Sequence, residues 1–229
     1  MCGLFFGSSG TSKMKQVKEN SQEFVDKLHD DGRHFGAVSE FDDTYSVGDP
    51  RKTSSRVKRD LDSLSTGGGT ALYDSIIKSV LTIQHARVEG NRTAMPALLL
   101  TFTDGKENRS EHDLQDVRSA IRKAGFTPRN RCYFAIAGIG DASQQELKDV
   151  CEGGLGVYTH TDDDIEEAFK LFIAATLAVV KGRQSYAELR KNEQSKSLKV
   201  LIREFEGVEI MPMEYMLNVD TSGSMSKTA

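Results

Sequence analysis

Apolar residues recur along this chain at two spacings, which together predict alternating helices and strands. Met14, Val17 and Phe24 lie at helical spacing within residues 13–28, with Lys and Glu residues between them. The run Ala97–Phe102 is almost entirely apolar, as expected of a strand that is buried on both faces. The same criteria predict further strands at 34–41, 44–47, 131–137 and 157–158, and further helices at 54–64, 71–87, 111–124, 143–151 and 162–180.

This alternation predicts an α/β fold with a doubly wound, mostly parallel central sheet and helices on both faces. We expect the whole chain to form one domain, in which residues 13–181 make the main α/β core. Residues 182–212 are predicted to connect this core, through a polar helix at 186–195 and a strand at 198–205, to a central strand and turn within 213–229. Ligand sites in such sheets lie at the carboxyl ends of the strands.

Composition and charge narrow the classes of function. The chain has 229 residues, of which 38% are hydrophobic and 28% charged, enough for a sizeable buried core. Its net charge of −4, spread over residues of both signs, gives no support to nucleic-acid binding, and no apolar run approaches the length of a membrane span. Cys2, Cys132 and Cys151 have unrelated spacings, so we expect reduced thiols in a cytoplasmic protein rather than a disulfide framework.

The candidate chemistry lies near the C-terminus. The predicted strand Tyr215–Val219 leads into Asp220-Thr221-Ser222-Gly223-Ser224, which places one carboxylate and two hydroxyls on a tight turn. All three groups are hard oxygen ligands, which suit Mg²⁺, Mn²⁺ or Ca²⁺ rather than zinc or copper. The pattern alone is a weak signal, because Ser- and Gly-rich turns also form for backbone reasons.

Two further segments strengthen the metal hypothesis. Residues 65–74, Ser-Thr-Gly-Gly-Gly-Thr-Ala-Leu-Tyr-Asp, place a threonine after a glycine run, and an aspartate follows the predicted strand 97–102. With these three segments the sequence resembles the von Willebrand factor A (vWA) family, whose metal ion-dependent adhesion site is built from such loops. The resemblance implies a binding domain that is not an enzyme, in which an acidic side chain of a protein partner completes the shell of a divalent cation. The ligands that it implies are Asp220, Ser222, Ser224, Thr70 and Asp104.

The order of the elements differs from that of the family. In vWA domains the metal motif follows the first strand and leads into a helix, whereas here it comes last and a suitable helix begins at Lys13. We therefore expect a circularly permuted order, in which the metal turn lies beside the start of that helix. Leu4–Thr11 resembles a degraded copy of Leu217–Ser224 with a glycine in place of the carboxylate, so residues 1–12 are displaced from the sheet, or Gly7–Ser12 is simply a flexible Gly/Ser linker. In the rival arrangement Leu4–Phe6 stays in the sheet, and the C-terminal strand enters a second copy in a strand-exchanged homodimer.

Two other functions stay open. Gly7–Met14 comes near a phosphate-binding loop, but Ser12 stands where a glycine is needed and Met14 where a Mg²⁺-binding hydroxyl is needed. A nucleotide-binding enzyme is therefore the second hypothesis. A structural domain with an inactive metal site is the third, and it applies if the C-terminal motif lies away from the other two loops. Residues 106–109 follow the third loop and are expected at the rim of the site.

Overall fold

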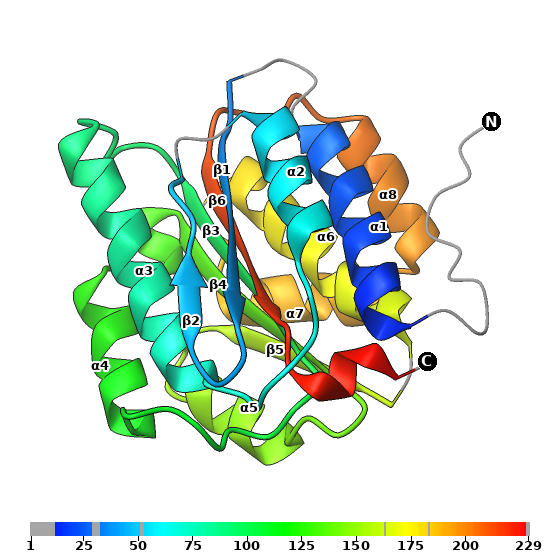
Figure 1. The fold of residues 1–229 in the computed structure, drawn as a ribbon. Helices are drawn as coiled ribbons and strands as arrows, with labels where there is room; N and C mark the ends of the chain where they lie inside the picture. The colour runs from blue at the N-terminus through cyan, green and yellow to red at the C-terminus, as the bar shows by residue number, and fades with distance from the viewer. Residues whose placement is uncertain (1–11, 29–32, 51–52, 163, 183, 228–229) are drawn as a thin grey trace.

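The structure is a computed structural model of the chain, and it describes residues 12–28, 33–50, 53–162, 164–182 and 184–227. Within these residues six strands form one sheet in the order β2-β1-β6-β3-β4-β5, and the predicted doubly wound α/β architecture is confirmed (Figure 1). Every strand pair is parallel except β1–β2, which is antiparallel. The strands are β1 Phe35–Phe41, β2 Tyr45–Val47, β3 Ala97–Thr103, β4 Cys132–Ile139, β5 Val157–Thr161 and β6 Glu214–Asp220.

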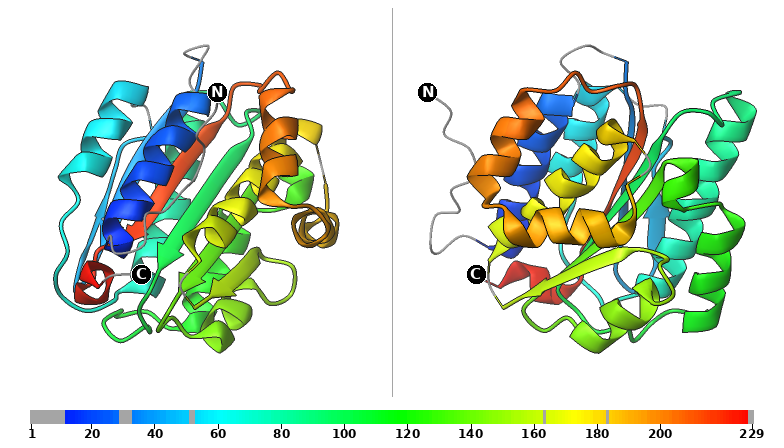
Figure 2. Two further views of the ribbon diagram at one scale, coloured as in Figure 1. Left: turned by 90° about the vertical axis from the view of Figure 1, so that its right-hand side faces the viewer. Right: turned by 180° about the vertical axis from the view of Figure 1, so that it is seen from behind.

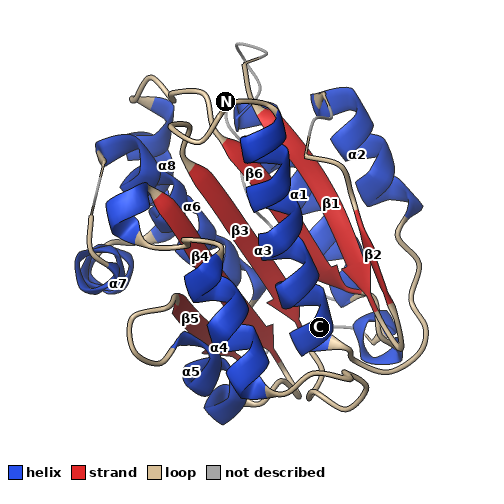
Figure 3. Cartoon of the chain, turned by 90° about the vertical axis from the view of Figure 1, so that its left-hand side faces the viewer, coloured by secondary structure: helices blue, strands red, loops and turns tan. Residues whose placement is uncertain are grey.

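Helices cover both faces of this sheet. The first face carries α1, α2, α6 and α8, and the second face carries α3, α4 and α5. Figure 2 shows the first group from the side and from behind, and Figure 3 shows α3 and α4 in front of the strands. The helices are α1 Lys13–Leu28, α2 Ser54–Ser63, α3 Leu72–Glu89, α4 Leu114–Lys123, α5 Gln144–Cys151, α6 Ile165–Lys181, α7 Tyr186–Ser195 and α8 Leu198–Glu206, with short 3₁₀ helices η1 Pro128–Asn130 and η2 Gly223–Ser226.

The C-terminal strand β6 lies in the middle of the sheet. It pairs in parallel with β1 on one side and with β3 on the other, so that Leu217 lies opposite both Val38 and Leu100. Every residue of β6 is buried. The predicted central position of Tyr215–Val219 beside Ala97–Phe102 is confirmed, and this position carries the following turn to the carboxyl ends of β1 and β3.

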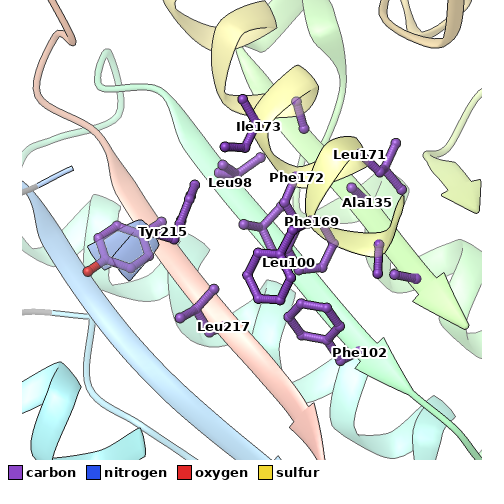
Figure 4. Close-up of a cluster of buried hydrophobic side chains, with 14 of the residues drawn as sticks. Leu98, Leu100, Phe102, Ala135, Phe169, Leu171, Phe172, Ile173, Tyr215 and Leu217 are labelled. Carbon is purple, nitrogen blue, oxygen red and sulfur yellow. The ribbon is translucent and has the colours of Figure 1, made fainter. Parts of the chain in front are cut away.

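The central strands are apolar on both faces because successive side chains enter different layers. Leu100 and Phe102 pack in the layer that contains α6, whereas Leu99 packs in the layer that contains α3 and α4. The ring of Phe102 lies 4.9 Å from that of Phe169 and 4.3 Å from that of Phe172, centroid to centroid (Figure 4). This two-sided burial fixes the strand ends, and with them the loops that follow.

The prediction of a strand at residues 198–205 is wrong, because this segment forms helix α8. Its buried residues are Leu201, Ile202 and Phe205, which recur at helical spacing and cannot share one face of a strand. Phe205 stacks on Phe24 of α1, with ring centroids 6.2 Å apart and planes 11° apart. Helix α8 therefore completes the α1 side of the core rather than adding a strand to the sheet.

The polar helix predicted at residues 186–195 is confirmed as α7. It begins with a capping box between Ser185 and Glu188. From this helix Arg190 donates to the carbonyl oxygen of Tyr158 on β5 (2.9 Å), and its guanidinium lies 4.4 Å from the centroid of the Tyr158 ring. Helix α7 thus covers part of an edge strand that would otherwise expose its hydrogen-bonding groups.

The cysteines, the turn between β1 and β2 and the helix lengths add three smaller observations. Cys132 and Cys151 are buried free thiols, as expected, and Cys2 lies outside the described residues. Strands β1 and β2 form a hairpin, and Asp42 closes its turn, because its Oδ1 accepts from the backbone nitrogen of Thr44 (2.9 Å). None of the helices in the described part of the chain combines the length and the apolar character needed to cross a membrane.

Candidate metal centre

The candidate site lies where β1, β6 and β3 end. Strand β6 ends at Asp220 and strand β3 ends at Thr103, and the two strands are direct neighbours in the sheet. The turn after β6 therefore faces the loop after β3. The glycine run Gly67–Gly69, which precedes α3, lies over the same strand ends, so all three predicted loops meet there.

Backbone hydrogen bonds hold these loops together. Gly67 N donates to Thr221 O (2.7 Å), and Gly223 N donates to Gly68 O (3.2 Å). Thr221 N also donates to Phe41 O at the end of β1 (2.7 Å). Gly68 has a φ of +72°, a conformation that side-chain-bearing residues rarely adopt, so a glycine is needed at this position. Main-chain hydrogen bonds therefore hold the turn after β6 to the glycine loop and to the end of β1.

Asp220 is a buried carboxylate that accepts three hydrogen bonds. Its Oδ2 accepts from Thr103 Oγ1 (2.6 Å) and from Asp104 N (3.3 Å), and its Oδ1 accepts from Ser222 N (2.8 Å). The side chain is 0% exposed. Burial raises the pKa of this carboxyl to about 6, with the neighbouring Asp104 carboxylate adding to the increase and the hydrogen bonds from Thr103 and Ser222 opposing it.

Asp104 faces the hydroxyl groups of the C-terminal turn. Its Oδ1 accepts from Ser224 Oγ (2.6 Å) and lies 3.4 Å from Ser222 Oγ, and the two serine hydroxyls lie 2.8 Å apart. Its Oδ2 accepts from the ammonium of Lys13 (3.2 Å), at the start of α1. The side chains of both partners in this ion pair are buried, at 5% and 0% exposure. Sequence analysis assigned no role to Lys13.

Thr70 reaches the same place from the glycine loop. It is buried, and a Cβ added to Gly105 would overlap its hydroxyl oxygen and lie 3.5 Å from Asp220 Oδ2. Asn108 holds this threonine from both sides, since Asn108 Oδ1 accepts from Thr70 N (3.0 Å) and Asn108 N donates to Thr70 O (3.1 Å). All five side chains implied by the sequence thus gather at one end of the sheet.

Several supporting residues were missed by sequence analysis. Glu107 accepts from the backbone nitrogens of Tyr73, Arg109 and Ser110 (2.8–2.9 Å), so it ties the loop after β3 to the start of α3. Arg109 pairs with Asp43 of the hairpin (2.8 Å). Residues 106–109 were expected only at the rim of the site, yet Asn108 holds Thr70 of the glycine loop and Glu107 holds the start of α3. Their polar composition is typical of any exposed loop and gave no signal of these contacts.

The donor set fits a hard divalent cation. Two carboxylates and three hydroxyls supply only oxygen ligands, the type that Mg²⁺, Mn²⁺ and Ca²⁺ prefer. Over the residues that the structure describes, Asp220 has no ion-pair partner, and a buried carboxylate without a cation is unfavourable. No group of three or more His, Cys, Asp or Glu side chains in the described ranges is arranged for a metal.

The comparison with protein families decides the classification. The family model of the von Willebrand factor type A domain matches residues 7–172, which is most of the chain. The chain belongs to this family. Domains of the vWA family generally serve in protein interaction and adhesion and are typically not enzymes, and they often bind a divalent metal. The matched range ends before β6, so it contains Thr70 and Asp104 but not the turn after β6.

Two solved structures are similar to this chain. A proximal thread matrix protein 1 (PTMP1) from the mussel byssus matches with a TM-score of 0.51 and 18% identity, over 76% of this chain and 42% of that one. A von Willebrand factor type A protein from Catenulispora acidiphila matches with a TM-score of 0.49 and 20% identity, over 73% of this chain and 38% of that one. The chain thus spans about two fifths of the length of these proteins. A search of curated proteins gave no match.

Proposed function

We propose that this vWA domain binds a divalent cation, Mg²⁺ or alternatively Mn²⁺ or Ca²⁺, and engages a protein partner through it. The carrying observation is the convergence of two buried carboxylates with three hydroxyls at the ends of β6 and β3. The ligands of the proposed site are Asp220, Ser222, Ser224, Thr70 and Asp104.

The carboxylates and the residues that hold them have different tasks in the proposed site. Asp220 and Asp104 supply the negative charge, and the hydrogen bond from Ser224 Oγ to Asp104 Oδ1 (2.6 Å) keeps the turn against that carboxylate. Thr103 orients Asp220 from behind through its hydroxyl (2.6 Å). A bound ion would supply a concentrated positive charge with open coordination positions, which an acidic side chain of the partner can occupy. The proposed activity is binding, with no catalytic step.

The proposal includes a permuted order of the vWA elements. Support comes from the contact between the metal turn and α1, where Lys13 N donates to Lys227 O (3.0 Å), so that the helix begins where the turn ends (Figure 2). Residues 1–11 lie outside the described residues, and β6 occupies the centre of the sheet between β1 and β3. Deleting residues 1–10 is then expected to leave a folded, metal-binding monomer with little loss of melting temperature. An unfolded deletion variant would instead support the strand-exchanged homodimer.

The two alternative functions, a structural domain and a nucleotide-binding enzyme, are not equally supported. The condition for a structural domain with an inactive metal site, a C-terminal motif away from the other two loops, is not met. The Lys13–Asp104 ion pair is the observation that keeps this alternative, because the ammonium can neutralise one carboxylate. The nucleotide-binding alternative depends on Gly7–Met14, of which residues 7–11 lie outside the described residues. In the described part of that segment, the amine of Lys13 is engaged by Asp104 rather than left for a phosphate. We also propose a reducing, cytoplasmic location, which the free thiols of Cys132 and Cys151 support.

Titration calorimetry with Mg²⁺ tests the proposed function. Wild type is expected to bind the ion, and Asp220→Ala is expected to lose binding because the variant lacks a charged ligand. Asp141→Ala is the matched control, since this carboxylate lies at the same end of the sheet but its side chain is 72% exposed. Equal Mg²⁺ affinity in wild type and Asp220→Ala would remove the hypothesis. Release of a bound partner by EDTA would show in addition that binding runs through the ion.

A further inference from the structure

The ammonium group of Lys13 lies in the candidate metal centre. Lys13 is the first residue of α1, yet only 4% of it is exposed. Its side chain passes over Gly140, where an added Cβ would lie 2.5 Å from Nζ, and ends 3.2 Å from Asp104 Oδ2. The absence of a side chain at Gly140 therefore leaves the path that the lysine uses.

The stability of α1 does not explain this position. A positive charge at the N-terminus of a helix is unfavourable, because it faces the positive end of the helix dipole. The first turn of α1 has no acidic residue to offset Lys13. Burial of an ammonium is also costly unless a carboxylate is paired with it. The buried contact with Asp104 is thus the interaction that holds the lysine in place.

Asp104 serves two sets of groups at once. Its Oδ2 accepts from the Lys13 ammonium, and its Oδ1 accepts from Ser224 Oγ (2.6 Å). Asp104 and Ser224 are both proposed metal ligands, so the lysine and a metal ion would share the carboxylate of Asp104. Together, the carboxylates of Asp104 and Asp220 and the ammonium of Lys13 carry a net charge of −1. A divalent ion added beside the ammonium would make that charge +1, whereas an ion that displaces it would make the charge zero.

We propose that Lys13 is a tethered cation that competes with the divalent ion for Asp104 and so sets the metal affinity of the domain. The inference rests on the proposed function. Binding of the ion displaces the ammonium from Asp104, because two cations on one buried carboxylate repel each other strongly. Loss of the ion returns the lysine, which neutralises Asp104 and holds the start of α1 beside it.

Calorimetry with two lysine variants tests this competition. Lys13→Met keeps a long apolar side chain but removes the charge, and it is expected to bind Mg²⁺ tighter than wild type by about tenfold or more. Lys15→Met is the matched control, because Lys15 lies in the same turn of α1 with 59% of its side chain exposed and pairs only weakly with Glu19 (3.8 Å). Its Mg²⁺ affinity is expected to stay within about twofold of wild type, since exposed charges are screened.

The outcomes separate this inference from the proposed function. Mg²⁺ binding by wild type with no gain in Lys13→Met would overturn the inference and leave the proposed function intact. Binding by Lys13→Met but not by wild type would support the inference in its strongest form. Absence of binding in wild type and both variants would overturn the proposed function and the inference with it.

A measurement on wild type keeps the inference testable if Lys13→Met does not fold. The protein is acetylated briefly with and without Mg²⁺, and modification of each lysine is quantified by peptide mass spectrometry. The Lys13 amine is expected to be protected without the ion and to gain reactivity with it, while Lys15 reacts equally in both samples and serves as the internal standard. Unchanged protection of Lys13 at saturating Mg²⁺ would overturn the displacement.

Discussion

The buried carboxyl of Asp220 predicts how the stability of the protein depends on pH in metal-free buffer. Burial raises its pKa from 3.8 to about 6, so the folded protein keeps the proton over a range in which the unfolded chain has lost it. One pKa unit corresponds to about 1.4 kcal/mol, so the shift corresponds to about 3 kcal/mol of unfolding free energy. Because the folded state binds the proton more tightly, this contribution is present below the unfolded pKa of 3.8 and is lost as the pH rises through about 6.

Urea unfolding in EDTA measures this effect. Wild type and Asp220→Asn are compared from about pH 3.5 to about pH 7.5, so that carboxyls common to both proteins cancel in the difference. As the pH rises over this range, the unfolding free energy of the variant is expected to increase by about 3 kcal/mol relative to that of wild type. A difference that stays constant with pH would refute the reasoning. With saturating Mg²⁺ the wild-type trend is expected to reverse, because the ion binds the ionised carboxylate.

Three further predictions concern the core and the loops. Phe102→Ala is expected to lower the unfolding free energy by about 3–5 kcal/mol in urea, because a fully buried ring is replaced by a cavity. Gly105→Ala is expected to weaken Mg²⁺ binding about tenfold in calorimetry, because the added methyl group overlaps the Thr70 hydroxyl and displaces it from the site. Glu107→Ala is expected to cost about 1–2 kcal/mol in urea, because it removes the carboxylate that caps the start of α3.

Each of these three has a control and a contradicting result. Leu81→Ala, at a residue that is 40% exposed, is expected to have a small effect beside the core variant. Gly67→Ala meets nothing within 4 Å and is expected to keep the Mg²⁺ affinity that Gly105→Ala loses. Glu111→Ala removes an exposed carboxylate on the same loop and is expected to be nearly neutral. Equal behaviour of a variant and its control would contradict the corresponding structural argument.

The fold was largely predictable from the sequence because burial dictates the apolar pattern. Ala97–Phe102 is apolar on both faces since layers pack on both, and helix α1 has the boundaries that its periodicity predicts. The strand predicted at residues 198–205 failed for a definable reason. Its apolar residues Leu201, Ile202 and Phe205 fit a helix, but a short apolar run does not show which period applies until its neighbours are known.

In the candidate site, only the residues of the three motif segments could be predicted from the sequence. The family resemblance implied Asp104 and Thr70, and the structure places both beside the C-terminal turn. Lys13 was missed because its partner lies 91 positions away, and nothing in the local sequence marks a lysine that points inward. Glu107 was missed for a similar reason, since a carboxylate that caps a helix from another loop leaves no spacing pattern.

The most direct test of the account is a crystal structure grown or soaked with Mn²⁺, with anomalous diffraction recorded to locate the ion. We expect one strong anomalous peak within bonding distance of the Asp220 carboxylate and the hydroxyls of Ser222 and Ser224, and the ammonium of Lys13 withdrawn from Asp104. A map without a peak at this place, in which Lys13 remains paired with Asp104 at saturating Mn²⁺, would contradict the central claim that this vWA domain holds a divalent cation at the ends of β6 and β3.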